Sequence, residues 1–90
     1  MSPEVRALLE AVLEAIDIPS PATVGDEPAF ARLLEDRALD AIVALHGALG
    51  ESLAGVDGMA WNTAYLRKQL AKKLPTTYRH FQTADGGARR

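Results

Sequence analysis

The 90-residue sequence contains no cysteine, which excludes disulfide bonds, thiolate metal sites and cysteine nucleophiles. It also contains no long hydrophobic run. The longest stretch without a charged residue, 41–50, is far shorter than the ~20 apolar residues that a membrane-spanning helix needs. Near the N-terminus the apolar pattern is interrupted by Glu4, Glu10 and Glu14, which is not typical of a signal peptide. We therefore expect a cytoplasmic protein with no membrane partner.

The motifs of common catalytic and metal sites are missing as well. There is no glycine-rich phosphate loop, no nucleophile elbow and no calcium-binding loop. The two histidines form no paired zinc motif. Asp36 and Asp40 lie one helical turn apart, but with Arg32 and Arg37 beside them they are better explained as an exposed charged edge than as paired catalytic carboxylates. We expect no metal, no cofactor and no enzymatic activity.

Apolar residues are present in the amount and spacing of one small helical domain. Hydrophobic residues make up 48% of the chain and charged residues 24%, which suits a globular fold. The apolar positions follow a helical period over about 3–16, 27–49 and 59–74. We therefore predict an all-α domain over residues 1–83, with three principal helices and a short C-terminal tail element, and a mobile tail at 84–90.

Local signals mark where these helices begin and end. Ser2 is suited to cap the first helix, Asp26 the second and Asp57 the third, because their side-chain oxygens can accept from free backbone N–H groups. Gly50 is suited to end the second helix. Beyond the third helix, Tyr78 and Phe81 lie three residues apart, which predicts one turn that folds back onto the core.

The second helix is predicted to be apolar on two sides. Leu39 and Val43, with His46 near them, point roughly opposite to its main stripe. A helix of this kind must be covered on both sides. The economical answer is a central position between two other helices, and the alternative is a dimer interface made by Leu39, Val43 and His46. The main stripe comprises Phe30, Leu34, Ala38, Ala41, Ile42, Leu45 and Leu49.

The third helix carries the main functional signal. Trp61 and Tyr65 lie one turn apart and share a side of the helix with Lys68 and Lys72, opposite to the predicted core face. Aromatic side chains dominate protein interfaces, and they can also stack on bases while lysines meet phosphates. A third interpretation is that the chain itself covers the rings. The predicted core face comprises Met59, Thr63, Leu66, Leu70 and Leu74.

The net charge of −2 conceals two opposite halves. Residues 1–60 carry three basic residues against eleven acidic ones, a net −8, whereas residues 61–90 carry seven against one, a net +6. Three explanations are open: internal pairing of the halves, a basic patch for an anionic partner, and head-to-tail self-association.

A nucleic-acid-binding regulator of the helix-turn-helix kind is the alternative function. Its candidate contacts to nucleic acid or another anion are Asn62, Arg67, Lys73 and Arg79. Against it, the break at 50–58 is longer than the usual 3–4-residue turn, and the isoelectric point of about 5.6 is acidic rather than basic. A protein partner or a second copy of the chain is therefore the preferred prediction.

Three stretches, 17–26, 35–37 and 61–67, resemble a group of small uncharacterised helical proteins from high-GC actinobacteria and their phages or mobile elements. They touch under a third of the chain, and its sixteen alanines agree with such a source. The resemblance implies an accessory or regulatory protein, with no known activity and no catalytic residue. We accordingly predict a non-enzymatic interaction module that binds a protein partner or itself.

Overall fold

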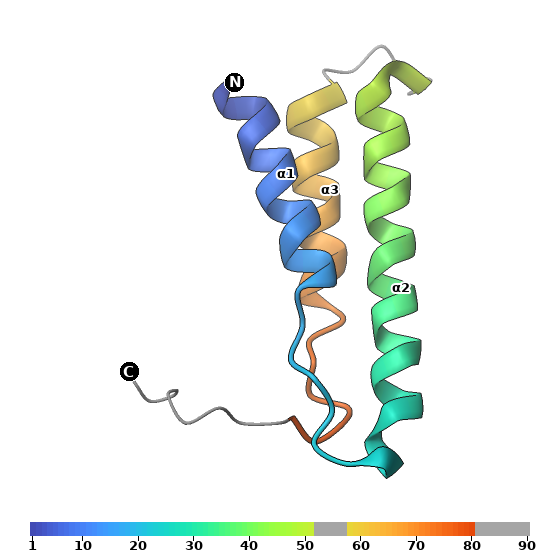
Figure 1. The fold of residues 1–90 in the computed structure, drawn as a ribbon. Helices are drawn as coiled ribbons and strands as arrows, with labels where there is room; N and C mark the ends of the chain where they lie inside the picture. The colour runs from blue at the N-terminus through green and yellow to red at the C-terminus, as the bar shows by residue number, and fades with distance from the viewer. Residues whose placement is uncertain (52–57, 81–90) are drawn as a thin grey trace.

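The computed structural model describes residues 1–51 and 58–80, and this part of the chain is all-α, as predicted. Three helices, α1 (Pro3–Ile16), α2 (Glu27–His46) and α3 (Gly58–Ala71), pack against one another in a small bundle. α1 and α3 run in the same direction and α2 runs opposite to both (Figure 1). Within the described residues, no helix has both the length and the apolar character needed to cross a bilayer.

The structure confirms the predicted residues at some helix ends and not at others. Ser2 caps α1, because its Oγ accepts from the backbone N–H of Val5 at 3.2 Å. Gly50 lies in the wide turn η2 (Gly47–Glu51) that follows α2, and its φ of +99° is the left-handed conformation that favours glycine. The prediction for Asp26 was wrong: it occupies the capping position of α2 but its side chain makes no capping bond. Asp57 lies outside the described residues.

The core is built largely from small side chains. Leu66 has no exposed surface, and four of the seven core residues are alanines, so the helices approach one another closely. The prediction that Leu74 belongs to this core was wrong: it is 56% exposed, because α3 ends at Ala71 and the chain then turns away before Pro75. The core comprises Leu8, Ala11, Ala15, Ala41, Ala44, Leu66 and Leu70.

The buried side of α2 differs from the predicted stripe. Ile42 and Leu49 are exposed, whereas Arg37 and Asp40, which were expected at an exposed edge, are buried. The whole helix is therefore rotated about its axis relative to the prediction. The physical reason is that Arg37 donates to backbone carbonyls of α1 and Asp40 pairs with Lys73, and both contacts lie between the helices. The buried residues of α2 are Leu33, Arg37, Asp40, Ala41 and Ala44.

The segment after α3 folds back to close the lower end of the bundle in Figure 1. Tyr78 is buried there, and its hydroxyl donates to the carbonyl oxygen of Pro19 at 2.5 Å, while its ring packs edge-on to Phe30 with the centroids 5.6 Å apart. An isolated antiparallel bridge between Pro21 and His80 adds to this contact. Phe81, the second ring of the predicted turn, lies outside the described residues. The tail expected to be mobile, 84–90, lies outside the described residues.

Candidate protein-interaction site

The two rings of α3 stack on each other at the surface. Trp61 and Tyr65 lie 5.7 Å apart between ring centroids with an angle of only 6° between their planes. Trp61 remains 53% exposed, whereas Tyr65 is half-buried and packs against the core. Tyr65 thus lies between the core and the indole, and the two stacked rings form one continuous aromatic surface. Aromatic side chains have few rotatable bonds, so burying such a surface costs little side-chain entropy.

Two lysines continue this surface, Lys68 on α3 and Lys72 in the turn directly after it. Lys68 and Lys72 are exposed, and in the described residues neither ammonium group has an ion-pair partner. A shallow depression of about 270 Å³ lies against the rings, with Ala64, Lys68 and Gln69 as its other lining residues. We name Trp61, Tyr65, Lys68 and Lys72 the aromatic–lysine face. It offers a flat apolar area next to two positive charges.

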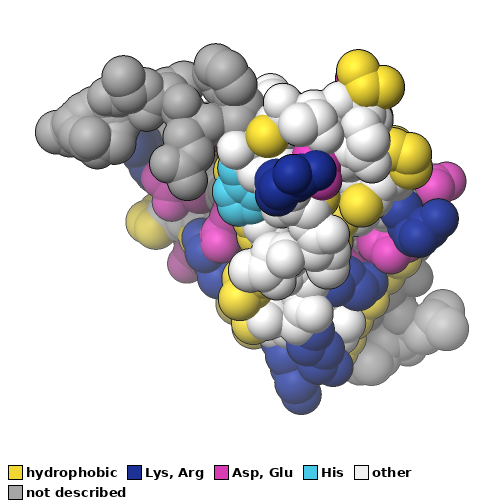
Figure 2. Space-filling model, turned by 90° about the horizontal axis from the view of Figure 1, so that it is seen from below, with side chains coloured by type: hydrophobic (Ala, Val, Ile, Leu, Met, Phe, Trp, Pro, Cys, Tyr) yellow, Lys and Arg dark blue, Asp and Glu magenta, His cyan; other side chains and the backbone are white. Residues whose placement is uncertain are grey.

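The other basic residues of this half that the structure describes are paired with acids of the first half. Arg67 pairs with Glu14 across the α1–α3 contact at 2.8 Å, and Lys73 pairs with Asp40 of α2 at the same distance. Arg79 pairs with Asp26 at 3.2 Å. Acidic and basic side chains accordingly lie next to one another in several places on the lower end of the bundle (Figure 2).

Each of these ion pairs joins a base of residues 61–80 to an acid of residues 1–40. Internal pairing therefore accounts for part of the charge asymmetry. The carboxylate of Asp26 also accepts from the Thr23 hydroxyl at 2.6 Å, and this hydrogen bond, with the Arg79 contacts, lowers the pKa of Asp26 below its usual value.

The structure does not bring the predicted nucleic-acid contacts together. Asn62 is 2% exposed and lies against the C-terminal end of α2, so it does not reach a ligand from the surface as expected. A Cβ on Gly47 would lie only 2.7 Å from Cγ of Asn62, which explains why glycine stands at this crossing. Arg67, Lys73 and Arg79 point to three different carboxylates.

Arg37 is the structural residue that the sequence analysis missed. It is 3% exposed, and its guanidinium donates to the carbonyl oxygens of Glu14 and Ala15 at 2.8 Å and of Lys73 at 2.5 Å. The carbonyls of Glu14 and Ala15 belong to the last turn of α1, and that of Lys73 lies two residues beyond the end of α3. The regular helical spacing of the charges predicted an exposed edge, and no local signal distinguished Arg37 from its neighbour Arg32.

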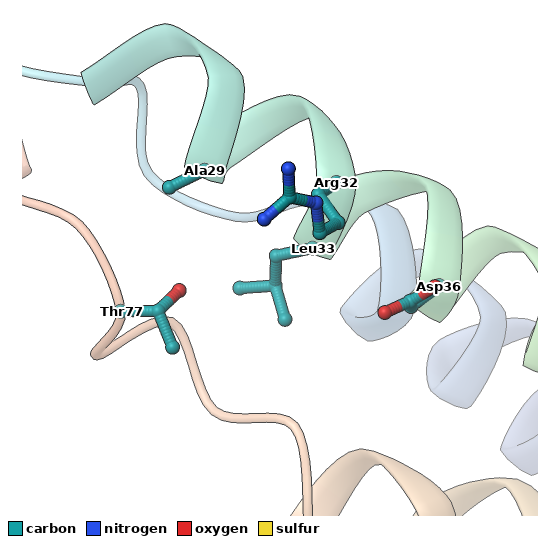
Figure 3. Close-up of a pocket in the computed structure, with 5 residues that line it drawn as sticks. All are labelled: Ala29, Arg32, Leu33, Asp36 and Thr77. Carbon is teal, nitrogen blue, oxygen red and sulfur yellow. The ribbon is translucent and has the colours of Figure 1, made fainter. Parts of the chain in front are cut away.

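A second depression lies between α2 and the segment after α3. It has a volume of about 270 Å³ and is lined by Ala29, Arg32, Leu33, Asp36 and Thr77. In Figure 3, Arg32 and Asp36 stand on successive turns of α2, Thr77 faces them from the other wall, and Leu33 lies between. Its polar groups do not converge on one point, so this depression lacks the arrangement of a small-molecule site.

The predicted dimer face lies on the outer side of α2. Leu39 and Val43 are about half exposed, and His46 is also exposed. Among residues 1–51 and 58–80, no segment encloses Leu39 or Val43. The expectation of a central helix enclosed on both sides therefore fails for the described part of the chain.

No protein-family model, no curated protein and no solved structure matches this chain. Among the described residues, no group of three or more histidine or carboxylate side chains is placed to hold a metal ion. The geometry of the exposed surfaces is therefore the basis for a functional proposal.

Proposed function

We propose that this protein is a non-enzymatic accessory or regulatory module that binds an acidic segment of a partner protein through the aromatic–lysine face. The observation that carries the proposal is the half-exposed Trp61, stacked on Tyr65 beside two lysines that lack carboxylate partners in the described residues. Burying apolar area contributes about 25 cal/mol per Å², and rigid aromatic anchors provide much of the binding energy of protein interfaces.

The position of the lysines defines the chemistry of the partner. Lys68 lies on the last turn of α3 and Lys72, four residues later, directly after the helix, so they match two carboxylates one turn apart on a partner helix. An aliphatic residue between those carboxylates would cover the depression beside the rings. Exposed ion pairs contribute only about 0.2–1 kcal/mol each, so the rings supply affinity and the lysines supply orientation and faster association.

The same geometry argues against nucleic acid as the ligand. Affinity for nucleic acid grows with the number of phosphates that basic side chains neutralise. Arg67, Lys73 and Arg79 are engaged with carboxylates, which leaves two lysines on this surface. Two positive charges are fewer than the basic patch of a nucleic-acid-binding domain usually contains.

Trp61 is the only tryptophan, so its fluorescence reports directly on the proposed site. We expect the indole to be accessible to acrylamide in the free protein. Addition of an amphipathic peptide with leucine and glutamate at helical spacing should shift its emission to shorter wavelength in a saturable manner. Replacing Lys68 and Lys72 by glutamate should weaken this binding by about tenfold or more, because two attractive contacts become repulsive.

The matched control is Arg32→Glu, which changes an exposed base on α2 that has no ion pair within the described part of the chain. It should leave peptide binding within about twofold. The variant Trp61→Ala should bind no peptide, as followed by calorimetry, while its helicity and thermal unfolding stay nearly unchanged, because the indole is half exposed. An indole protected from acrylamide, or a Trp61→Ala variant that unfolds, would show that this ring belongs to the core. A response to single-stranded DNA alone would favour the nucleic-acid alternative.

A further inference from the structure

The outer side of α1 has the chemistry that the aromatic–lysine face is proposed to bind. Leu9, Leu13 and Ile16 follow one another at spacings of four and three residues, which places them on one side of the helix. They are 45%, 58% and 48% exposed. Asp17 follows directly, it is exposed, and within the described part of the chain its carboxylate has no ion pair. We name Leu9, Leu13, Ile16 and Asp17 the α1 outer stripe.

From this match we infer that the aromatic–lysine face of one copy binds the α1 outer stripe of a second copy, so that the chain associates head to tail. The inference rests on the proposed function, because it names the partner of that same face. The stripe supplies aliphatic side chains for the rings and a carboxylate for the lysines. Glu10 and Glu14 stand between its members, so the segment holds leucine and glutamate at helical spacing.

The spacing of the charges sets the orientation of the two copies. Trp61 and Lys72 are eleven residues apart, and Arg6 and Asp17 are eleven residues apart as well. With α3 of one copy parallel to α1 of the other, Lys72 lies beside Asp17, and Trp61 lies beside Arg6, whose guanidinium can stack on an indole. The antiparallel alternative places Lys72 beside Arg6, and like charges repel. Charge complementarity therefore selects the parallel orientation of these two helices.

This contact joins two different surfaces of the chain. The aromatic–lysine face lies on α3 and in the turn directly after it, whereas the α1 outer stripe lies on α1 and at its C-terminal cap, so the two share no residue. Each copy in a pair keeps one of the two surfaces unoccupied, and a further copy can bind there. Association of this kind continues beyond the dimer as concentration rises.

The exposed area makes each contact weak. The exposed parts of Leu9, Leu13 and Ile16 together equal about one and a half aliphatic side chains, and about half of Trp61 is exposed. A standard interface buries about 800 Å² per partner, which is more than these side chains offer. Association should therefore need high protein concentration. It should also weaken at high salt, because salt screens the attraction between Lys72 and Asp17.

Analytical ultracentrifugation of the full chain over a wide concentration range tests the proposal. The wild type should form dimers and then larger species. Trp61→Ala and Leu13→Lys should each stay monomeric with unchanged helicity, because each removes one of the two surfaces. Leu39→Lys is the matched control for Leu13→Lys: this leucine is 54% exposed but lies on α2, outside both surfaces, and the variant should associate like the wild type.

A mixture of the two monomeric variants tests the head-to-tail arrangement. Trp61→Ala retains the α1 outer stripe and Leu13→Lys retains the aromatic–lysine face, so an equimolar mixture should form one-to-one dimers that grow no further. Charge exchange tests the orientation. Lys72→Glu and Asp17→Lys should each weaken association by about threefold or more, and the double variant should recover most of it.

The proposal is overturned by a wild type that stays monomeric at every concentration, by loss of association in Leu39→Lys, by a mixture that forms no dimer, or by a double variant without recovery. Failure of the proposed function gives a different result. A chain that binds the amphipathic peptide through Trp61 but stays monomeric retains the proposed function and refutes self-association. A chain that does neither refutes both.

Discussion

Replacement of Arg37 by methionine should destabilise the fold more than any exposed substitution, although the change removes a charge from a buried position. α1 and α3 run in the same direction, so the negative ends of two helix dipoles meet at the lower end of the bundle. The guanidinium of Arg37 lies between them and donates to three carbonyl oxygens that no helical N–H can reach. Its positive charge is thus balanced by backbone carbonyls.

The magnitude follows from these three hydrogen bonds. A hydrogen bond from a charged donor contributes about 1.5–3 kcal/mol, and a buried acceptor that loses its partner costs a further penalty. Because two of the three bonds are only partly buried, water can replace part of the loss. We expect Arg37→Met to lose at least about 3 kcal/mol of unfolding free energy, which corresponds to roughly 12–24 °C in Tm for a domain of this size.

Urea and thermal unfolding followed by circular dichroism measure this loss. Arg37→Lys should recover only part of it, because an ammonium group keeps the charge but lacks the planar fork that reaches several carbonyls. Arg32→Met, on the same helix but exposed, should change stability by no more than about 0.5 kcal/mol. If Arg37→Met stays within about 1 kcal/mol of the wild type, the guanidinium does not hold the two helix ends together, and the argument fails.

Two further predictions concern the helix crossing and the tail contact. Gly47→Ala should destabilise the protein by about 1–2 kcal/mol in chemical unfolding, because overpacking against the buried Asn62 outweighs the gain in helix propensity. In an Asn62→Ala background the same change should become stabilising. Tyr78→Phe should cost about 1 kcal/mol at pH 7 through the lost hydrogen bond to Pro19. Burial raises the pKa of Tyr78 above its usual value, and the charge of Arg37 partly opposes this shift. The unfolded chain therefore loses the phenol proton at lower pH than the folded protein, so the wild type should lose stability as pH rises above about 10. Tyr78→Phe should not show this loss of stability at high pH.

The helices were predictable because their signals are local. The oxygen of Ser2 caps α1 as its position before Pro3 indicates, and Gly50 adopts the left-handed conformation expected at a helix end. Apolar periodicity located all three helices to within a few residues. The end of α3 was placed too late, since the chain leaves the helix at Ala71 although Pro75 is the first residue that must break it.

The packing was less predictable, because it depends on partners that are distant in sequence. Arg37 and Asp40 have the spacing of an exposed charged edge, and their burial is explained only by carbonyls of α1 and by Lys73 beyond α3. The burial of Asn62 was not predictable either: its polar side chain suggested a surface position, but it packs against Gly47 at the end of α2. The side of α3 that carries Trp61 was predictable, since its rings and lysines form their own stripe opposite Leu66.

The charge asymmetry of the sequence has two parts with different physical roles. Arg67, Lys73 and Arg79 each join a different element of the acidic half, namely α1, α2 and the turn before α2. Exposed pairs such as Arg67–Glu14 contribute little to stability. Wrong pairings would place like charges together, so the three pairs favour one arrangement of the three helices over others. Lys68 and Lys72 take no part in this pairing in the described residues. Because this pairing does not involve them, their position beside two stacked rings is the feature on which the proposed partner site rests.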